Sequence, residues 1–211
     1  MKLYNYWRST SSHRVRIALH LKGIPYEYVA VNLLEGKQHE ADHRARSPMS
    51  KVPVLELDDG HRITESMAII EYLDDIQATP PLLPRDPYLR ARARMLAEMV
   101  NSGIQPLQNR SLNQYIKKVL GADDKTFTHH WIEQGLHALE VAVAETASRF
   151  CVGDEPSLAD VYVVPQMLGS RRFGVDVEVL PTLRRIEDAC AELKGFKDAA
   201  PDRQPDAQPG A

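Results

Sequence analysis

A run of four hydroxyl residues near the start of the chain has the residue types and the position of an anion-binding site. Residues 9–12, Ser-Thr-Ser-Ser, stand between an apolar stretch at residues 2–7 and a helical pattern from Val15 to Leu19. The first amides of a helix lack partners within the helix and the dipole is positive there, so a carboxylate, phosphate or thiolate is stabilised. Serine and threonine are also common helix caps. An ordinary cap is therefore the alternative for this stretch.

Two further pairs have groups that suit a peptide-like ligand. Val52–Pro53 precedes an expected strand, and a cis bond there would turn the backbone of Val52 toward the first helix start. Proline at the first position of a strand is also an ordinary structural choice. Glu65 and Ser66 offer a carboxylate, a hydroxyl and helix-start amides, which suit the ammonium and carboxylate of an α-amino acid. A plain helix cap is the alternative for this second pair.

A third serine-led segment indicates folding rather than binding. Residues 157–160, Ser-Leu-Ala-Asp, follow Gly-Asp-Glu-Pro at residues 153–156. Serine followed three residues later by an acidic residue is the pattern of a capping box, here with Asp160 in the reciprocal position. The segment therefore predicts the start of a core helix.

Composition narrows the class of protein. The chain has 211 residues, 43% of them apolar, which is enough for a core. Its 26 basic and 29 acidic side chains give a net charge of −3 without a basic tract, so nucleic acid is not an expected partner. We find no signal-peptide pattern or long apolar run, and expect no membrane association and a cytoplasmic location. Cys151 and Cys190 are expected in the core, and no metal site is expected.

The elements that must position these residues alternate in the first eighty residues. A hairpin is expected where Asp58-Asp59-Gly60 joins two apolar runs. Gly23 has the position of a residue that ends a helix. The expected order is β-α-β-α-β-β-α, a mixed sheet of the α/β class. In that order, the elements span residues 2–7, 12–22, 27–31, 38–45, 54–57 and 61–64, with a last helix that begins at Glu65 or Ser66.

The remainder of the chain has a helical period. Four prolines in the nine residues from Thr79 indicate a linker, because proline lacks an amide donor and has a fixed φ. Beyond it the expected helices span residues 88–101, 106–120, 126–146, 158–168 and 182–192. We therefore expect a first domain at 1–82, a linker at 83–88 and an all-helical domain at 89–211. From about residue 201 the tail is polar and proline-rich, and is expected to be poorly structured unless contacts order it.

These features together resemble a cytosolic glutathione transferase, which implies a thioredoxin-like N-terminal domain followed by an all-α C-terminal domain. More specific strings resemble the zeta class, which contains the maleylacetoacetate and maleylpyruvate isomerases. The resemblance runs from residue 2 to about 206. The strings that carry it are Arg8–Leu19, Lys22–Gly23, Ala68–Leu73, Gly103–Asn109, Val152–Asp154, Val164–Gln166, Arg172–Phe173 and Arg203–Asp206.

The resemblance implies that glutathione is the cofactor and assigns residues to it. Hydroxyl donors and a helix start favour the thiolate over the thiol, and the residues implied in catalysis are Ser9, Thr10, Ser11 and Arg8. A small dicarboxylate substrate would be held by Arg8, Arg110 and Arg172. The residues implied in glutathione binding are Ser9, Thr10, Ser11, Ser12, His13, Arg14, Gln38, Val52, Glu65, Ser66, Gln105, Asn109, Arg110 and Ser111.

Two residues depart from the family pattern. Ser11 stands where the family commonly has cysteine, which removes a disulfide-forming reaction from this site. His13 stands where the family commonly has tryptophan, and we expect it on the helix surface or behind the site rather than as a base. Arg14 and Arg16 are expected to serve structure or the subunit contact.

The implied reaction is glutathione-dependent cis–trans isomerisation. A thiolate adds to the alkene, the resulting single bond rotates, and elimination gives the trans product. Maleylacetoacetate is the preferred substrate, in the breakdown of aromatic amino acids and other aromatic compounds, with glutathione transferase activity as a side reaction. Maleylpyruvate is the alternative substrate, and a non-catalytic binding or regulatory module is the alternative of another class. A homodimer is implied by the resemblance and by apolar residues at 95, 96, 99 and 100.

Overall fold

The computed structural model describes residues 1–208, which form two compact units. The first unit combines Met1–Pro81 with the chain from Glu192 onward, and the second spans Leu82–Ala191. The boundary after Pro81 lies one residue before the expected end of the first domain, and the segment expected as a linker, 83–88, belongs to the second unit. The assignment of residues 192–208 to the helical domain is wrong, because this segment packs on the first unit. The last three residues of the expected second domain, 209–211, lie outside the described part of the chain.

The first unit contains a four-stranded mixed sheet with the strand order β2-β1-β3-β4. Strand β1 (Lys2–Asn5) pairs in parallel with β2 (Glu27–Ala30) and antiparallel with β3 (Val54–Glu56). Strand β4 (Arg62–Thr64) returns antiparallel to β3 through the Asp-Gly hairpin. The predicted mixed sheet is thereby confirmed, with strands one or two residues shorter than expected at their ends.

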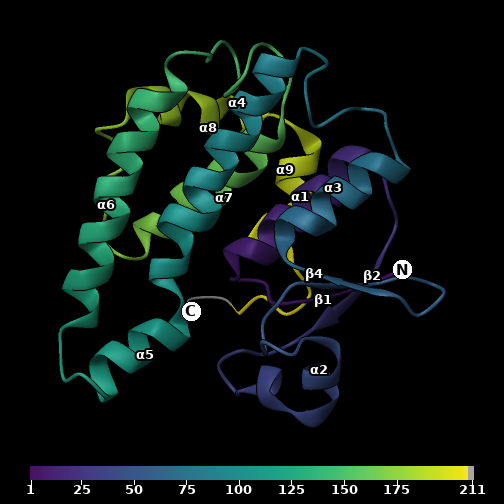
Figure 1. Ribbon diagram of the computed structural model, residues 1–211, viewed down its shortest axis with the longest axis vertical. Coiled ribbons are helices and arrows are strands. Elements are labelled where there is room, and N and C mark those ends of the chain that lie inside the picture. Colours follow the sequence, from purple (N-terminus) through teal and green to yellow (C-terminus); the bar gives the residue numbers. More distant parts are fainter. Residues whose placement is uncertain (209–211) are drawn as a thin grey trace. The chain divides into compact units, whose positions relative to one another are not determined.

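Helices cover both faces of this sheet. Helix α1 (Thr10–Lys22) and helix α3 (Ser66–Ile76) lie on one face, and the 3₁₀ turn η1 (Lys37–His39) leads to helix α2 (Ala41–Arg46) on the other (Figure 1). Helix α1 is buried on nearly every side because the sheet, α3 and the C-terminal segment surround it. Gly23 ends α1 in the left-handed conformation, with φ of 64°, as predicted.

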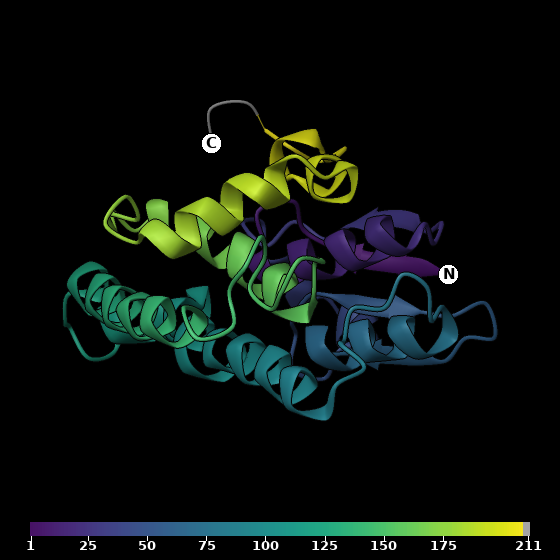
Figure 2. The ribbon, with the colours of Figure 1, turned by 90° about the horizontal axis from the view of Figure 1, so that it is seen from above.

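The C-terminal segment is ordered by contacts with the first unit. Helix α9 (Lys194–Ala199) packs along α1 (Figure 2), and the 3₁₀ turn η4 (Pro201–Arg203) follows it. The buried side chain of Gln204 donates to the carbonyls of Asp198 at 2.9 Å and Ala200 at 2.8 Å. Two outcomes were expected for this tail, and residues 201–208 follow the one in which contacts order the chain.

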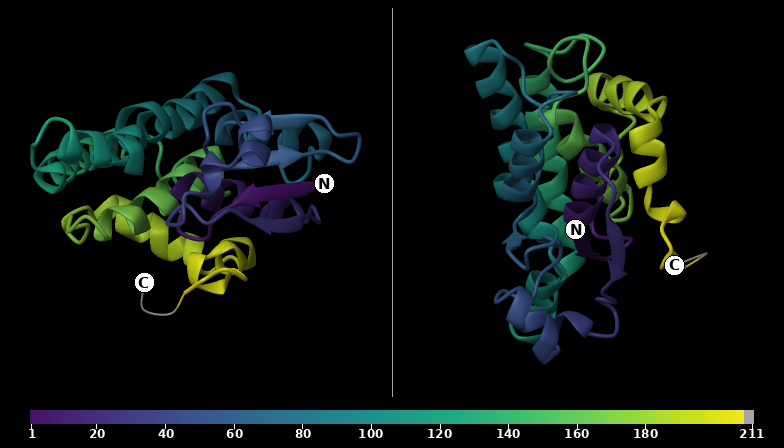
Figure 3. Two further views of the ribbon diagram at one scale, coloured as in Figure 1. Left: turned by 90° about the horizontal axis from the view of Figure 1, so that it is seen from below. Right: turned by 90° about the vertical axis from the view of Figure 1, so that its right-hand side faces the viewer.

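The second unit consists mainly of helices, as predicted (Figure 3). Helix α7 contacts α4, α8 and the π-helical turn η2, and most of its residues are buried. Cys151 and Cys190 are free and buried, as predicted. Within residues 1–208, no helix combines the length and apolar character that crossing a membrane requires. The elements of this unit are α4 (Pro87–Glu98), η2 (Met99–Ile104), η3 (Gln105–Gln108), α5 (Arg110–Lys118), α6 (Asp124–Val143), α7 (Leu158–Arg171) and α8 (Pro181–Ala191).

Candidate active site

The sheet register brings four segments of the first unit to one edge. Tyr4 on β1 is paired with Val54 on β3, and Val54 is paired with Thr64 on β4. The end of β1, the start of β3 and the end of β4 therefore lie side by side. Strand β2 runs parallel to β1 and ends at the same edge. Residues 6–12, 51–53, 65–66 and the chain after β2 are the segments that this edge collects.

The serine run begins helix α1, and its first residue is the cap. Ser9 has an extended conformation and its hydroxyl oxygen accepts the N–H of Ser12 at 3.2 Å. The helix starts at Thr10, two residues earlier than expected. Among the described residues, no acceptor is placed for the hydroxyl hydrogens of Ser9, Thr10 and Ser11. Donors therefore remain available beside the positive end of a helix, which is what an anion site requires.

The Val52–Pro53 peptide bond is cis, so the cis alternative raised for this pair is confirmed. Lys51, which precedes this pair, is held by side chains of helix α2 and of the turn that follows the helix. His43 lies with Nε2 2.9 Å from the carbonyl oxygen of Lys51, and the hydroxyl of Ser47 accepts the N–H of Lys51 at 3.1 Å. Both backbone groups of Lys51 are thus fixed, which leaves Val52 in a defined orientation at the sheet edge.

The Glu65–Ser66 pair begins helix α3 in a strained conformation. Glu65 is the cap residue with φ of 66°, a left-handed value that a residue with a side chain rarely adopts. Glu65 is exposed, and its carboxylate makes no capping hydrogen bond. Ser66 is buried, and its hydroxyl accepts from the guanidinium of Arg14 at 3.3 Å. Strain at this position is typical of functional sites.

Gln38 provides a direct test of whether a peptide ligand fits this edge. Its side-chain oxygen Oε1 is buried, and within residues 1–208 it accepts no hydrogen bond. A buried acceptor without a donor is costly, so a ligand N–H is a fitting partner. Glutathione is a tripeptide with backbone N–H groups, a thiol and three charged groups. The donors at residues 9–11, the acceptor on Gln38 and the backbone of Val52 are of the types such a ligand needs.

The structure separates the other N-terminal residues by burial. Arg8 is half-buried, with its guanidinium 5.5 Å from the centre of the Trp7 ring. His13 is 4% exposed, so the expectation of a helix-surface position is wrong, and a place behind the site stays a prediction. Arg14 and Arg16 are fully buried, which agrees with a structural role. Packing of α1 beneath α3 and α9 explains why these polar side chains point inward.

The remaining candidate residues belong to the helical unit, each close to a helix end. Gln105 donates to the side-chain oxygen of Asn109 at 2.8 Å, and Asn109 is the residue that precedes helix α5. Arg110 and Ser111 form the exposed first turn of that helix. Arg172 is the exposed residue at the end of α7. The first four are thus neighbours along one connection. Their participation in the sheet-edge site stays a prediction.

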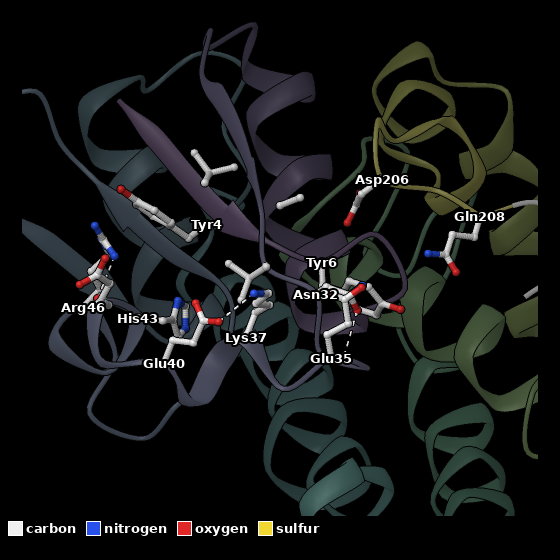
Figure 4. Close-up of a pocket in the computed structure, with 14 residues that line it drawn as sticks. Tyr4, Tyr6, Asn32, Glu35, Lys37, Glu40, His43, Arg46, Asp206 and Gln208 are labelled. Atoms are coloured by element: carbon white, nitrogen blue, oxygen red, sulfur yellow. Dashed lines mark hydrogen bonds and ion pairs between the residues drawn. The ribbon is translucent and has the colours of Figure 1, made fainter.

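A pocket of about 530 Å³ opens on the sheet face beside α2 and extends to Tyr6 and the chain after β2. Its walls include Tyr4 and Tyr6 from β1 and its continuation. Figure 4 shows Arg46 at one end and Asp206 with Gln208 at the other. Its charged residues are of both signs: Lys37 pairs with Glu40 across this region, for example. This mixture of charges favours neither a positively nor a negatively charged ligand.

Comparisons with known proteins agree with the resemblance. Residues 8–76 match the family model for the glutathione S-transferase N-terminal domain. The chain is 45% identical to a maleylpyruvate isomerase from a Ralstonia species, over 98% of this chain and 100% of the relative. A structure of maleylacetoacetate isomerase from Anaeromyxobacter dehalogenans, with bound GSH in its active site, has 52% identity and a TM-score of 0.91 over 98% of this chain and 97% of that one. Another structure of that protein holds dicarboxyethyl glutathione and citrate.

A holo structure of a maleylpyruvate isomerase, described as a bacterial glutathione S-transferase of the zeta class, gives a TM-score of 0.95 at 43% identity. The match covers 99% of this chain and all of that one. The chain therefore belongs to the glutathione S-transferase family, in its zeta class. The predicted family and fold class are confirmed. Sequence reasoning missed His43, which holds Lys51, and Asp206, which accepts the N–H of Trp7. The string at 203–206 was a signal for Asp206, but no role was assigned to it.

Proposed function

We propose that this chain is a glutathione-dependent cis–trans isomerase that converts maleylacetoacetate to fumarylacetoacetate. The observation that carries the proposal is the convergence of the Ser9 helix start, the cis Val52–Pro53 segment and the strained Glu65 turn at one sheet edge. Relatives that share this fold are named as isomerases of maleyl compounds. Glutathione transferase activity is proposed as a side reaction of the same site.

Residues of the first unit would hold glutathione in three places. Bound glutathione supplies a thiolate nucleophile that can add to the substrate alkene and leave again. The Ser9 oxygen already accepts the Ser12 N–H, and this bond does not use the hydroxyl hydrogen, which can donate to sulfur. The Val52 backbone would bind the peptide part beside Gln38. Glu65 with the start of α3 would bind the α-amino-acid end.

Arginines would hold the substrate. A maleyl compound carries carboxylates, and a guanidinium binds a carboxylate through two directed hydrogen bonds. Arg8 directly precedes Ser9, which places a cation next to the proposed sulfur site, and it would also stabilise negative charge that develops on the substrate ketone. Arg110 and Arg172 are proposed for the far carboxylate.

Maleylpyruvate is the second candidate substrate, favoured by the relative at 45% identity and the holo structure at TM-score 0.95, both named maleylpyruvate isomerase. The two substrates share the maleyl end, so discrimination depends on the far end. A small difference in a pocket discriminates by about 10 to 200-fold, and we expect some activity on both compounds.

The deciding experiment measures kcat/KM for both substrates with saturating glutathione and without it. We expect turnover of both with glutathione, a higher kcat/KM for maleylacetoacetate, and loss of turnover without glutathione. A higher kcat/KM for maleylpyruvate would make maleylpyruvate the preferred substrate and leave the proposed mechanism unchanged. Glutathione binding without isomerisation of either compound would instead indicate a binding or regulatory module.

The assembly and location are also proposals. A homodimer is proposed from family membership, and sedimentation at micromolar concentration tests it. Leu96 and Val100, two of the four apolar residues that favoured a dimer, are fully buried and do not offer a contact surface. Met95, 38% exposed, remains a candidate contact residue. A cytoplasmic location and the absence of nucleic-acid and membrane partners remain proposals from composition.

A further inference from the structure

The peptide groups around Trp7 are held by residues far away in the sequence. The N–H of Trp7 donates to the Oδ2 atom of Asp206 at 3.2 Å. The carbonyl of Trp7 accepts from the Arg16 guanidinium at 3.0 Å. Trp7 lies two residues before Ser9, so both sides of this residue are fixed where the chain approaches the proposed sulfur site.

The same arginine is also connected to Ser9 through one shared carbonyl. The carbonyl oxygen of Tyr6 accepts the N–H of Ser9 at 3.0 Å and an Arg16 N–H at 3.3 Å. Arg16 further donates to the side chain of Asn5 at 3.0 Å and to the carbonyl of Ala199 at 3.2 Å. A single buried guanidinium therefore joins the end of β1, the Ser9 turn and the C-terminal segment.

Burial and charge make this arrangement sensitive to Asp206. Arg16 is fully buried, and desolvation lowers its pKa to about 10, while Tyr28, Tyr26 and Asp206 act to raise it. Arg16 stays charged at neutral pH, and a buried cation is costly unless anions and carbonyls surround it. Asp206 supplies negative charge at this place and also accepts the hydroxyl of Tyr28 on β2.

The C-terminal segment places Asp206 through its own hydrogen bonds. Helix α9 packs on α1, and Gln204 ties residues 198 and 200 to the turn that follows. Asp206 comes two residues later and reaches across to the chain after β1. Figure 4 shows its carboxylate above Tyr6.

We propose that Asp206 is a positioning residue, which together with Arg16 sets the geometry of the Tyr6–Ser9 turn and hence of the Ser9 hydroxyl. This inference rests on the proposed function, because it assigns a purpose to the turn that would hold the thiolate. Asp206 touches neither the reacting atoms nor Ser9 itself. It acts through the N–H of Trp7, and a misplacement of about 1 Å at a reacting group can cost up to about 10²-fold in rate.

The test compares Asp206→Ala, Asp206→Asn and the control Asp202→Ala. Asp202 is an exposed carboxylate in the same segment, on turn η4, so its removal changes the charge without changing the contact to Trp7. For Asp206→Ala we expect kcat/KM about 10-fold lower, the pKa of bound glutathione raised, and faster hydrogen exchange of the Trp7 amide in the ligand-free protein. Asp206→Asn keeps one oxygen acceptor and should recover part of each effect.

Tyr28→Phe keeps the carboxylate and its bond to Trp7 while it removes one anchor of Asp206, so it keeps the inference testable if Asp206→Ala fails to fold. We expect a smaller shift of the bound thiol pKa in the same direction. Equal thiol pKa and equal Trp7 exchange in Asp206→Ala and Asp202→Ala would overturn the inference. Failure of the proposed function would give a different result. The wild-type protein would then bind glutathione with an ionised thiol but would isomerise neither substrate.

Discussion

Helices α1 and α7 both begin after a serine, and the two starts differ in what remains unpaired. At α7, the Oδ2 atom of Asp160 accepts both the N–H and the hydroxyl of Ser157 at 2.8 Å, and its Oδ1 atom accepts the N–H of Cys151 at 2.8 Å. At α1, Ser9 caps with its oxygen, and its hydroxyl hydrogen remains for a ligand. Serine is a good cap in both places.

The difference lies in burial and in the partner residue. Asp160 is fully buried, and burial raises the pKa of its carboxyl although its hydrogen bonds oppose the shift. The α7 start is a closed set of donors and acceptors in the core, as the capping-box pattern predicted. The α1 start has no acidic residue in its first turn, so nothing from the helix itself neutralises its positive end. A serine cap is available for binding only when the chain supplies no acceptor of its own.

The largest expected effect is on protein stability and comes from the start of helix α7, where Asp160 accepts three hydrogen bonds. Asp160→Ala leaves three buried donors without an acceptor and should lower the free energy of unfolding by about 3–5 kcal/mol. Urea denaturation measures the loss. We expect kcat per folded molecule to stay near the wild-type value, because Asp160 belongs to the helical unit and takes no part in the proposed site. A fall in kcat as large as the fall in stability would remove the contrast between the two helix starts.

The next largest effect is on the catalytic rate and comes from the start of helix α1. Ser9→Ala removes the donor proposed for the thiolate and should lower kcat by about 10²-fold, with a loss of stability near 1 kcal/mol from the missing cap. Steady-state kinetics with saturating glutathione measures the first quantity and urea denaturation the second. Ser102→Ala, an exposed serine that bonds to the Glu98 carbonyl, serves as the control. If Ser9→Ala retains normal turnover, Thr10 or Ser11 becomes the candidate donor.

The smallest effect separates members of the serine run. Ser12 is fully buried, and its hydroxyl oxygen lies 3.5 Å from the N–H of Tyr6, a long contact. Ser12→Ala should lower the free energy of unfolding by about 1 kcal/mol or less and change kcat by less than about threefold. A loss of rate similar to that of Ser9→Ala would show that the run acts as one unit, and the role proposed for Ser9 alone would be incorrect.

Local patterns predicted most of the elements. Three features depend only on residues that are close together in sequence, so a local pattern predicts them. They are the hairpin at Asp58–Gly60, the helix end at Gly23 and the capping box at Ser157. The start of α1 was placed two residues late, because Thr10 and Ser11 suit a cap as well as a first turn. The short helix α9 was missed, since six residues with a glycine among them give little periodic signal.

The sequence by itself determined the family, the mixed sheet, the helical second unit and the capping box at Ser157. Only the tertiary structure decided that the tail belongs to the first unit and that Asp206 and Arg16 hold the chain beside Ser9. The physical reason is distance along the chain. A capping bond spans three residues and leaves a local pattern, whereas the bond from Asp206 to Trp7 spans 199 residues and follows from packing of α9 on α1.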